Sequence, residues 1–237
     1  MKKEQYKTMG DVIDEWEEEN LNLLHQIPKK IIIQNRLIER EQFIKNQLNN
    51  KIKVLDIGSM NDNRRLFLEY RKINKNIIGI DLEGWYDLEC FNKEVDISLF
   101  KPIFKADCQN FNLNQKFDLI ICGEVIEHLS NFQGFFNSLR KHLTENGRVI
   151  ITTPNPMSFM RLCQKLIKQE PSNDKYHTIM LDSITFSNMC HENGFKVVEN
   201  YYYYEKHSTI WTYKLNNYIS YIFPKYASGY LFIIKNI

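Results

Sequence analysis

Several features that would mark a specialised class of protein are scarce in this chain of 237 residues. It has nine glycines and six prolines, too few for a collagen-like repeat or a long flexible linker. The first residues contain no apolar run of the kind found in signal peptides. The most apolar stretch, 218–234, is interrupted by Pro224, Lys225 and Gly229, so it falls short of the roughly 18 to 20 apolar residues of a membrane span. We therefore expect no transmembrane segment and a cytoplasmic location, while peripheral membrane contact through this tyrosine-rich end stays open.

Paired cysteines and an excess of charge are also missing. The five cysteines include no CxxC pair, so neither a disulfide framework nor a thiolate zinc site is indicated. The 31 basic and 29 acidic residues leave a formal net charge of +2, which argues against nucleic acid as a partner and favours a small molecule. Hydrophobic residues at 43% and charged residues at 25% are typical of a globular domain. We expect the protein to be a monomer or a homodimer.

The first 50 residues predict two helices. Apolar residues of the first recur at helical spacing from Val12 to Leu24, opposite a face rich in Asp and Glu. Pro28 suits the first turn of a second helix, whose apolar stripe includes Leu37 and Ile44 and which ends at Asn49-Asn50. We interpret residues 1–50 as a helical cap that either covers a substrate pocket or only packs on the core.

From residue 51 to residue 237 the pattern changes to alternating strands and helices. Short apolar runs predict strands in the segments 53–58, 76–81, 116–122, 147–154, 195–205 and 230–234. Helical patterns lie between them in the segments 66–73, 131–143, 157–168 and 183–193, and Glu145–Gly147 predicts a turn before the strand 147–154. Strands joined through helices require parallel crossovers, which predicts an α/β fold with a Rossmann-like, doubly wound sheet and helices on both faces.

Acidic and small residues stand at the ends of the first two predicted strands. Asp56-Ile57-Gly58 closes the first, where a glycine lets the backbone approach a ligand. Asp81 closes the second, where a carboxylate can accept hydrogen bonds from two ribose hydroxyls. Taken alone, both aspartates could equally be no more than strand caps.

The order of the later motifs identifies a family resemblance. Asp107 lies in the polar segment KADCQNF before the third strand, GEVIEHL follows that strand, and TTPNP ends the next. With Asp56, Gly58 and Asp81, this series resembles the class I S-adenosylmethionine-dependent methyltransferases over roughly residues 51–199. It is most similar to the branch that includes 3-demethylubiquinol O-methyltransferases and small enzymes of surface-glycan pathways. The resemblance implies a seven-stranded sheet and S-adenosylmethionine as cofactor.

By position, the cofactor-binding residues that the resemblance implies are Asp56, Gly58, Ser59, Asp81, Leu82, Asp107, Cys108, Gly123 and Glu124. The first three would line the methionine end, the next two the ribose and the next two the adenine, and the last two would close the floor. The family loop usually reads D-x-G-x-G-x-G, whereas Met60 and Asp62 stand here at the second and third glycines. Because S-adenosylmethionine has no pyrophosphate, the need for bare backbone is weaker than in nicotinamide enzymes.

The segment GEVIEHL also carries candidate catalytic groups. Glu124, Glu127 and His128 are spaced to share one face of a helical turn, and His177 could join them as a fourth ligand. Two carboxylates and two imidazoles suit Mg²⁺, Mn²⁺ or Zn²⁺, and small-RNA 2′-O-methyltransferases hold a divalent ion with such a segment. Without an ion, His128 is the candidate base, assisted by Glu127. A purely structural role for this turn stays open.

Several acceptors are compatible with these motifs. We expect O-methylation of a sugar, a nucleotide-linked sugar or a phosphorylated intermediate of surface-glycan (capsule or lipopolysaccharide) biosynthesis. RNA 2′-O-methylation, quinone O-methylation and a degenerate, non-enzymatic scaffold are the alternatives. Two further expectations concern side chains outside these motifs. His142 and His191 are expected as surface or helix-face residues rather than ligands, and Tyr201–Tyr204 with two rings inward and two outward.

Overall fold

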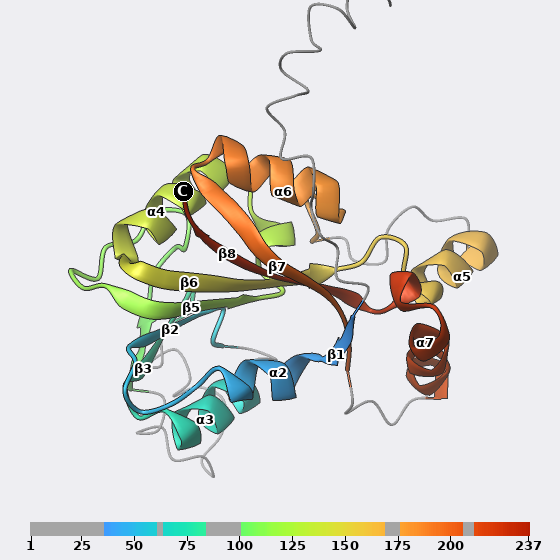
Figure 1. The fold of residues 1–237 in the computed structure, drawn as a ribbon, viewed down its shortest axis with the longest axis horizontal. Coiled ribbons are helices and arrows are strands. Elements are labelled where there is room, and N and C mark those ends of the chain that lie inside the picture. Colours follow the sequence, from blue (N-terminus) through green and yellow to red (C-terminus); the bar gives the residue numbers. More distant parts are fainter. Residues whose placement is uncertain (1–35, 61–63, 84–100, 169–175, 206–210) are drawn as a thin grey trace, which may run out of the picture. The chain divides into compact units, whose positions relative to one another are not determined.

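The computed structural model describes residues 36–60, 64–83, 101–168, 176–205 and 211–237 (Figure 1). All of them belong to one compact unit, Ile33–Ile237. The helix expected from Val12 to Leu24 lies outside the described residues, so the helical cap over residues 1–50 stays a prediction.

A single sheet forms the centre of this unit. Its strands are β1 (Leu37–Glu39), β2 (Val54–Ile57), β3 (Ile77–Asp81), β4 (Ile103–Lys105), β5 (Phe117–Gly123), β6 (Leu143–Pro154), β7 (Phe195–Tyr204) and β8 (Gly229–Asn236). The strands lie in the order β1-β7-β8-β6-β5-β2-β3-β4. Every neighbouring pair is parallel except those of β8, which lies antiparallel between β6 and β7. The predicted α/β, doubly wound architecture is confirmed.

The described residues contribute eight strands to the sheet rather than the seven expected. The additional strand is β1, which pairs with β7 in the register Leu37 to Tyr202, within a segment predicted as helix. Only Arg40–Asn46 of that segment forms a helix among the described residues. Three residues cannot display the alternation of a strand, so Leu37 is equally compatible with a helical stripe.

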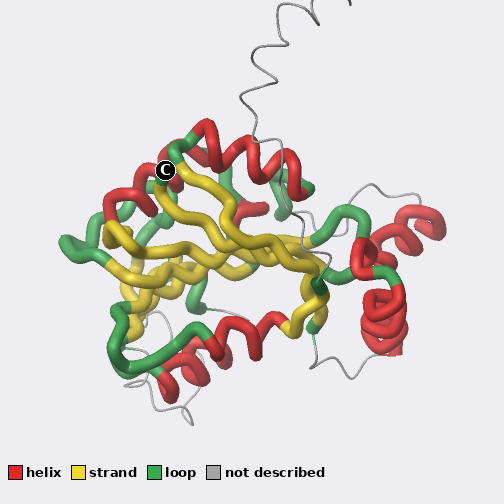
Figure 2. Tube along the Cα trace, viewed as in Figure 1, coloured by secondary structure: helices red, strands yellow, loops and turns green. Residues whose placement is uncertain are grey.

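Helices cover both faces of the sheet and extend beyond one edge (Figures 1 and 2). The α-helices are α2 (Arg40–Asn46), α3 (Arg64–Ile73), α4 (Phe132–His142), α5 (Phe159–Lys168), α6 (Ser183–Glu192) and α7 (Trp211–Ile222), and the 3₁₀ turns are η4 (Ile126–His128) and η5 (Pro224–Tyr226). Helices α4 and α6 cover one face, and α2 and α3 the other. Helices α5 and α7 contact each other after the carboxyl ends of β6 and β7.

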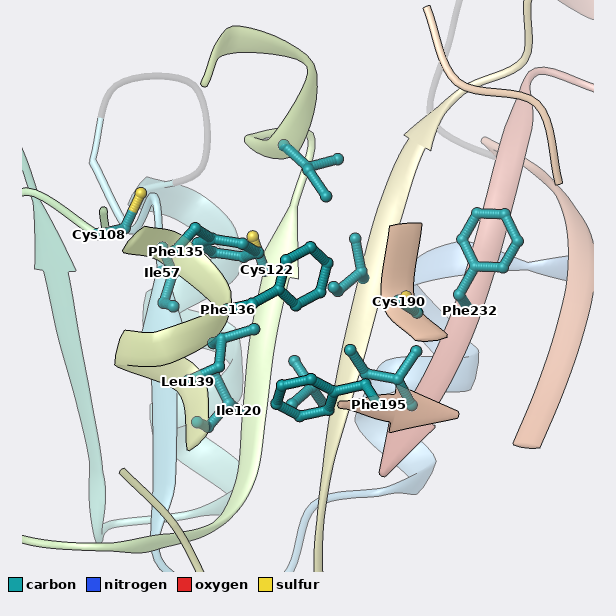
Figure 3. Close-up of a cluster of buried hydrophobic side chains, with 14 of the residues drawn as sticks. Ile57, Cys108, Ile120, Cys122, Phe135, Phe136, Leu139, Cys190, Phe195 and Phe232 are labelled. Atoms are coloured by element: carbon teal, nitrogen blue, oxygen red, sulfur yellow. The ribbon is translucent and has the colours of Figure 1, made fainter. Parts of the chain in front are cut away.

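Two apolar clusters, one on each face, hold the sheet between its helices. Figure 3 shows the first, in which Phe135, Phe136 and Leu139 of α4 lie against Ile120 and Cys122 of β5. All five side chains are fully buried. The second cluster joins α2 and α3 to the opposite face of the strands. Because both faces are covered, the central strands are continuous apolar runs rather than alternating ones.

Coverage of both faces also corrects the expectation for the four tyrosines of β7. Tyr201 and Tyr203 lie in the cluster of α2 and α3, whereas Tyr202 lies in the cluster of α4. All three are buried, and only Tyr204 is partly exposed. The prediction of two outward-facing rings was wrong because neither face of this sheet faces solvent here.

Strand β6 contains an irregularity where the sequence predicts a turn. Phe117 pairs with Leu143, and the next pair is Leu119 with Arg148. Between these two pairs, one residue of β5 therefore lies opposite four of β6, and the expected turn Glu145–Gly147 forms a bulge within the strand instead of preceding it.

Candidate active site

A cavity of about 790 Å³ opens at the carboxyl ends of the parallel strands, the edge at which open α/β sheets bind ligands. Its volume is within the range of small-molecule pockets. The predicted site residues that line it are Gly58, Asp81, Leu82, Asp107, Cys108, Glu124, Glu127, His128 and His177. Asp56 and Gly123 instead line a small adjoining cavity of about 20 Å³, and Ser59 is fully buried.

The loop after β2 is held against the end of β3. Gly58 has a φ of 79°, a conformation that a side chain would disfavour, and its N–H donates to the carbonyl of Ile80 over 2.9 Å. The N–H of Met60 donates to Oδ2 of Asp81 over 2.8 Å. Met60, which replaces the second family glycine, buries its side chain in the core. The substitution therefore serves packing, while Asp62 lies outside the described residues.

Asp56 lies near the end of β2, two residues before Gly58. Its side chain is buried, and the Ser59 hydroxyl donates to its backbone carbonyl over 2.7 Å. Burial raises the pKa of Asp56 to about 7 against the effect of Ser59, and the charge of Asp81 adds to the increase. Asp56 thus holds the loop through its backbone carbonyl, whereas Asp81 lines the cavity.

The segment after β4 forms the next part of the wall. Oδ1 of Asp107 accepts from the N–H of Gln109 over 2.9 Å, and Oε1 of Gln109 accepts from the N–H groups of Ser130 and Asn131 over 3.0 and 2.6 Å. Gln109 therefore ties the Asp107 loop to the start of α4, a role that the sequence did not reveal. Burial raises the pKa of Cys108 to about 12, so its thiol stays neutral.

Glu124 does not share a helical face with Glu127 and His128, contrary to the prediction. It has a φ of 55°, the left-handed region, and precedes the 3₁₀ turn η4. Its N–H donates to the carbonyl of Thr152 over 3.1 Å, and its Oε1 accepts from the Tyr203 hydroxyl over 2.8 Å. The side chain thereby bonds to β7 and is not part of the close cluster that Glu127 and His128 form with His177.

A buried arginine from the start of α2 completes this corner of the cavity. Arg40 lies 3.1 Å from Glu205 and 3.8 Å from Glu124, and its guanidinium carbon is 5.3 Å from the centre of the Tyr203 ring. Burial lowers the pKa of Arg40, but Tyr203, Glu124 and Glu205 outweigh that effect and raise it, so the arginine stays charged. No motif in the sequence connected Arg40, Tyr203 and Glu205 with the site.

Glu127, His128 and His177 do come together. One ligand atom from each lies within 4.8 Å of the others, and the two imidazole rings are 4.8 Å apart in an edge-to-face arrangement. The segment that carries His177 is held in place by Thr178, whose N–H donates to the carbonyl of Glu127 over 2.8 Å and whose hydroxyl donates to that of Leu129 over 2.7 Å.

Glu127 is buried and only partly compensated. Thr153 donates to its Oε2 over 3.3 Å, whereas its Oε1 has no hydrogen-bond partner among the described residues. Burial and the nearby Glu124 raise the pKa of Glu127 to about 9. A buried carboxylate oxygen beside two imidazoles is a donor set that fits a divalent cation, since carboxylate and imidazole together suit Mn²⁺ or Zn²⁺.

The tautomer of His128 follows from its contact. Its Nδ1 lies 3.1 Å from the carbonyl oxygen of Tyr176, which can only accept. The proton therefore lies on Nδ1, and Nε2 carries the lone pair that could bind a cation or take a proton.

His142 lies on a face of α4, as one alternative of the prediction states, but it is buried rather than at the surface. It is 1% exposed, stacks on Phe111 and accepts from the N–H of Leu113 through Nε2 over 3.0 Å. Its Nδ1 faces the carbonyl of Ser138 over 2.8 Å. This side of α4 is covered by the segment that follows β4, which the helix pattern alone did not show. His191 is exposed as expected.

Fold and cavity together define a Rossmann-like protein with a ligand-sized cavity at the carboxyl ends of its parallel strands. A family described as "Methyltransferase domain" matches residues 24–200, and the chain belongs to that family. The predicted class I S-adenosylmethionine-dependent methyltransferase is thus confirmed in family and fold.

Solved structures and a curated relative agree with this assignment. A SAM-dependent methyltransferase from Archaeoglobus fulgidus is 19% identical, with a TM-score of 0.52 over 83% of this chain and 94% of that one. An O-methyltransferase of a Brevibacillus brevis polyketide synthase, in complex with S-adenosyl-L-homocysteine, is 16% identical, with a TM-score of 0.50 over 97% and 80%. A ubiquinone biosynthesis O-methyltransferase of Rickettsia akari is 28% identical over 134 residues, 56% of this chain and about half (51%) of that protein.

None of the helices in the described part of the chain is long and apolar enough to span a membrane.

Proposed function

We propose that this protein transfers a methyl group from S-adenosylmethionine to a hydroxyl oxygen of a small molecule. One observation carries the proposal: a single cavity is lined by Asp81 and Asp107 and also by the cluster of Glu127, His128 and His177. The aspartates suit a nucleoside, and the cluster suits activation of an oxygen. O-methyltransferases among the relatives support the same reaction.

The cofactor is assigned to the strand ends β2 to β5. In this proposal Asp81 accepts from the ribose hydroxyls, Asp107 accepts from the adenine amino group, and Leu82 and Cys108 lie beside the ring. The methionine end lies over Gly58 and Glu124, with Asp56, Ser59 and Gly123 shaping the wall behind. The positive φ of Gly58 and the free space of the cavity are consistent with such a ligand. Glu124 belongs to this side because it is directed toward Tyr203.

The acceptor is assigned to the other end of the cavity. Glu127, His128 and His177 would hold a divalent ion, and the charge of that ion would lower the pKa of a hydroxyl beside it. Arg161, which also lines the cavity, is a cation close to this cluster and is available to an anionic part of the acceptor. During transfer the carbon–oxygen bond forms as the carbon–sulfur bond breaks, and Nε2 of His128 receives the hydroxyl proton where no ion occupies it.

Two acceptor classes have support. A sugar, nucleotide-linked sugar or phosphorylated glycan intermediate suits the polar lining. Arg40 and Arg65 in this lining pair with glutamates, whereas Arg161 has a buried guanidinium nitrogen without a hydrogen-bond partner among the described residues. A phenol of the quinol type is favoured by the ubiquinone biosynthesis O-methyltransferases among the relatives. RNA is not favoured, since the chain is nearly neutral.

Release of S-adenosylhomocysteine tests the proposal. The purified protein is given S-adenosylmethionine with nucleotide sugars or with catechols, each in EDTA and in Mg²⁺, Mn²⁺ or Zn²⁺. We expect metal-dependent release with one acceptor class. Saturable cofactor binding without release from any hydroxyl acceptor would contradict O-methyl transfer, and failure to bind the cofactor would favour a scaffold.

Binding of Mn²⁺ alone, followed by calorimetry, tests the ion separately. We expect Glu127→Gln to weaken Mn²⁺ binding at least tenfold, because it removes the buried anionic ligand. Glu145→Gln, at an exposed position of β6, is the matched control and should leave the affinity unchanged. Equal Mn²⁺ affinity in both variants would exclude Glu127 as a ligand.

A further inference from the structure

Helix α7 exposes apolar side chains and buries polar ones, which is the reverse of a typical surface helix. Lys214, Tyr218, Tyr221 and Ile222 follow the i, i+4, i+7, i+8 spacing of a single helix face. The last three are 66%, 63% and 53% exposed, and Phe223 directly after the helix is 53% exposed. An apolar face of this kind normally lies against a core. Here most of its area is exposed, and Tyr221 has one contact with the sheet, in which its ring centre lies 5.2 Å from that of Tyr204.

Polar side chains occupy the inward face of the same helix. Asn216 and Ser220 are buried, at 2% and 0% exposure. Asn216 donates to the Ser228 hydroxyl over 3.0 Å and accepts from the N–H of Met160 over 3.4 Å. These bonds fix the rotation of α7 about its axis. Turning the tyrosines inward would break them, so the outward apolar face is built into the fold.

Helix α5, which contacts α7, repeats the arrangement. Leu166 and Ile167 are each 81% exposed, whereas Arg161, one to two turns earlier, lines the cavity. We call the exposed apolar residues of the two helices, together with Phe223 and the exposed lysines Lys165, Lys214 and Lys225, the α5–α7 surface.

The charge of this region has one sign. Helices α5 and α7 and the turn η5 carry Arg161, Lys165, Lys168, Lys214 and Lys225. The same three elements contain no Asp or Glu. Across the whole chain, in contrast, basic and acidic residues nearly balance, at 31 and 29. The α5–α7 surface therefore combines exposed apolar and aromatic side chains with a local excess of positive charge.

We propose that the α5–α7 surface binds an anionic lipid bilayer. Tyrosine, phenylalanine and branched aliphatic side chains enter the boundary between headgroups and acyl chains, and lysines beside them pair with anionic headgroups. No helix of the described residues crosses a bilayer, so the contact is peripheral. The inference goes beyond the proposed reaction and needs neither cofactor nor acceptor.

Co-sedimentation with vesicles tests this inference on the full chain. Vesicles of phosphatidylcholine alone are compared with vesicles that also contain phosphatidylglycerol, each at low and high salt. We expect binding to the anionic vesicles that weakens as salt rises, because the lysine contribution is screened.

Two sets of variants assign the binding to this surface. The pair Tyr218→Ser and Ile222→Ser removes exposed apolar area, and we expect at least a tenfold loss of vesicle affinity. The pair Lys214→Glu and Lys225→Glu should cost about fivefold or more per lysine. The matched controls are Ile184→Ser and Lys141→Glu, exposed positions on α6 and α4 over a face of the sheet, which should leave vesicle binding unchanged.

Three outcomes would overturn the inference. They are no vesicle binding by the parent chain, equal binding to neutral and anionic vesicles, and a parent dimer in analytical ultracentrifugation that Tyr218→Ser with Ile222→Ser converts to monomer. The last would identify a second copy of the chain as the occupant. Cofactor titration of each variant reports whether its fold is intact. If a variant fails to bind the cofactor and the parent chain binds it, the variant has lost its fold. If the parent chain also fails, the result concerns the proposed reaction rather than this surface.

Discussion

The two sides of the cavity are built in different ways. On the cofactor side, the polar groups already bond to one another: Met60 to Asp81, and Gln109 to both Asp107 and Asn131. On the acceptor side, Glu127 is buried with one oxygen lacking a hydrogen-bond partner among the described residues. The first side is a preformed wall. The second carries a carboxylate whose raised pKa reflects a cost that a cation would remove.

The difference separates the residues that we expect to bind the cofactor from those that we expect to serve catalysis. A preformed wall binds a ligand with little reorganisation, so its residues contribute to affinity. An uncompensated buried group costs stability and persists where it serves chemistry. We therefore expect substitutions on the cofactor side to change binding of S-adenosylmethionine, and those on the acceptor side to change turnover.

Glu127→Gln has the largest expected effect and gives the sharpest test of that separation. The amide keeps the shape but cannot supply the negative charge, so we expect kcat to fall about thousandfold. The affinity for S-adenosylmethionine, measured by calorimetry, should change less than about threefold. A parallel loss of cofactor affinity would show that the two sides are not separable.

Asp81→Ala should act in the opposite way. It removes the acceptor for the Met60 N–H and for the ribose, and two charge-assisted hydrogen bonds correspond to about hundredfold in cofactor affinity. Calorimetric titration measures the change. Asp118→Ala is the matched control, since Asp118 accepts from the N–H of Lys53 over 2.9 Å near the amino end of β5 and does not line the cavity. Equal losses in the two variants would remove Asp81 from the site.

Tyr203→Phe probes the corner between the two sides. It leaves Oε1 of Glu124 without the hydroxyl that donates to it, so we expect the free energy of unfolding to fall by about 1–2 kcal/mol. Urea unfolding measures this. Tyr201→Phe, on the same face of β7, is the control: Tyr201 bonds to Glu199 at a less buried position, and the loss should stay below about 0.5 kcal/mol.

The smallest effect concerns His142, behind the cofactor wall. Burial lowers its pKa against the opposing effect of the Ser138 carbonyl, and protonation of Nε2 would oppose the Leu113 N–H. At this residue the unfolded chain therefore binds more protons, so the contribution of His142 to the free energy of unfolding should fall as pH drops below the ordinary histidine value of about 6.5. The raised pKa values of Asp56 and Glu127 act in the opposite direction over the same range.

The contribution of His142 is therefore measured as a difference, by urea unfolding of the parent chain and of His142→Gln at pH 7.5 and 5.5. On going to pH 5.5 the variant should lose less stability, or gain more, than the parent chain, whereas His191→Gln, on the exposed side of α6, should behave as the parent does.

Two acids of the cofactor side could be predicted from the sequence because they stand at the ends of apolar strands, whereas Asp107 was assigned only through the family resemblance. Asp56 and Asp81 were located in this way, as was the parallel order of the strands. The corner of Arg40, Glu124 and Tyr203 could not be, since its members lie far apart in the chain and meet only through the pairing of β1 with β7. The left-handed Glu124 is equally hidden, because glutamate gives no signal for a positive φ.

The face that helix α7 buries could not be predicted from the sequence, for a different reason. Its apolar residues recur at helical spacing, but the buried face is the polar one, fixed by Asn216. Hydrophobic periodicity locates a helix and then assigns its apolar face to the core. Here that assignment is reversed, and only the tertiary hydrogen bonds reveal it.

The place of β8 in the sheet has a consequence for synthesis. Among the described residues β8 is the last strand in chain order, yet it lies between β6 and β7 and is the only strand that links them within the sheet. During translation, β7 and β1 therefore have no partner on the β6 side until residues 229–236 have left the ribosome. Until then, the edges of β6 and β7 are both unpaired and open to wrong contacts. A nascent chain that stalls before residue 229 would thus hold two incomplete sheets, and chaperone binding to such a chain should end when β8 emerges.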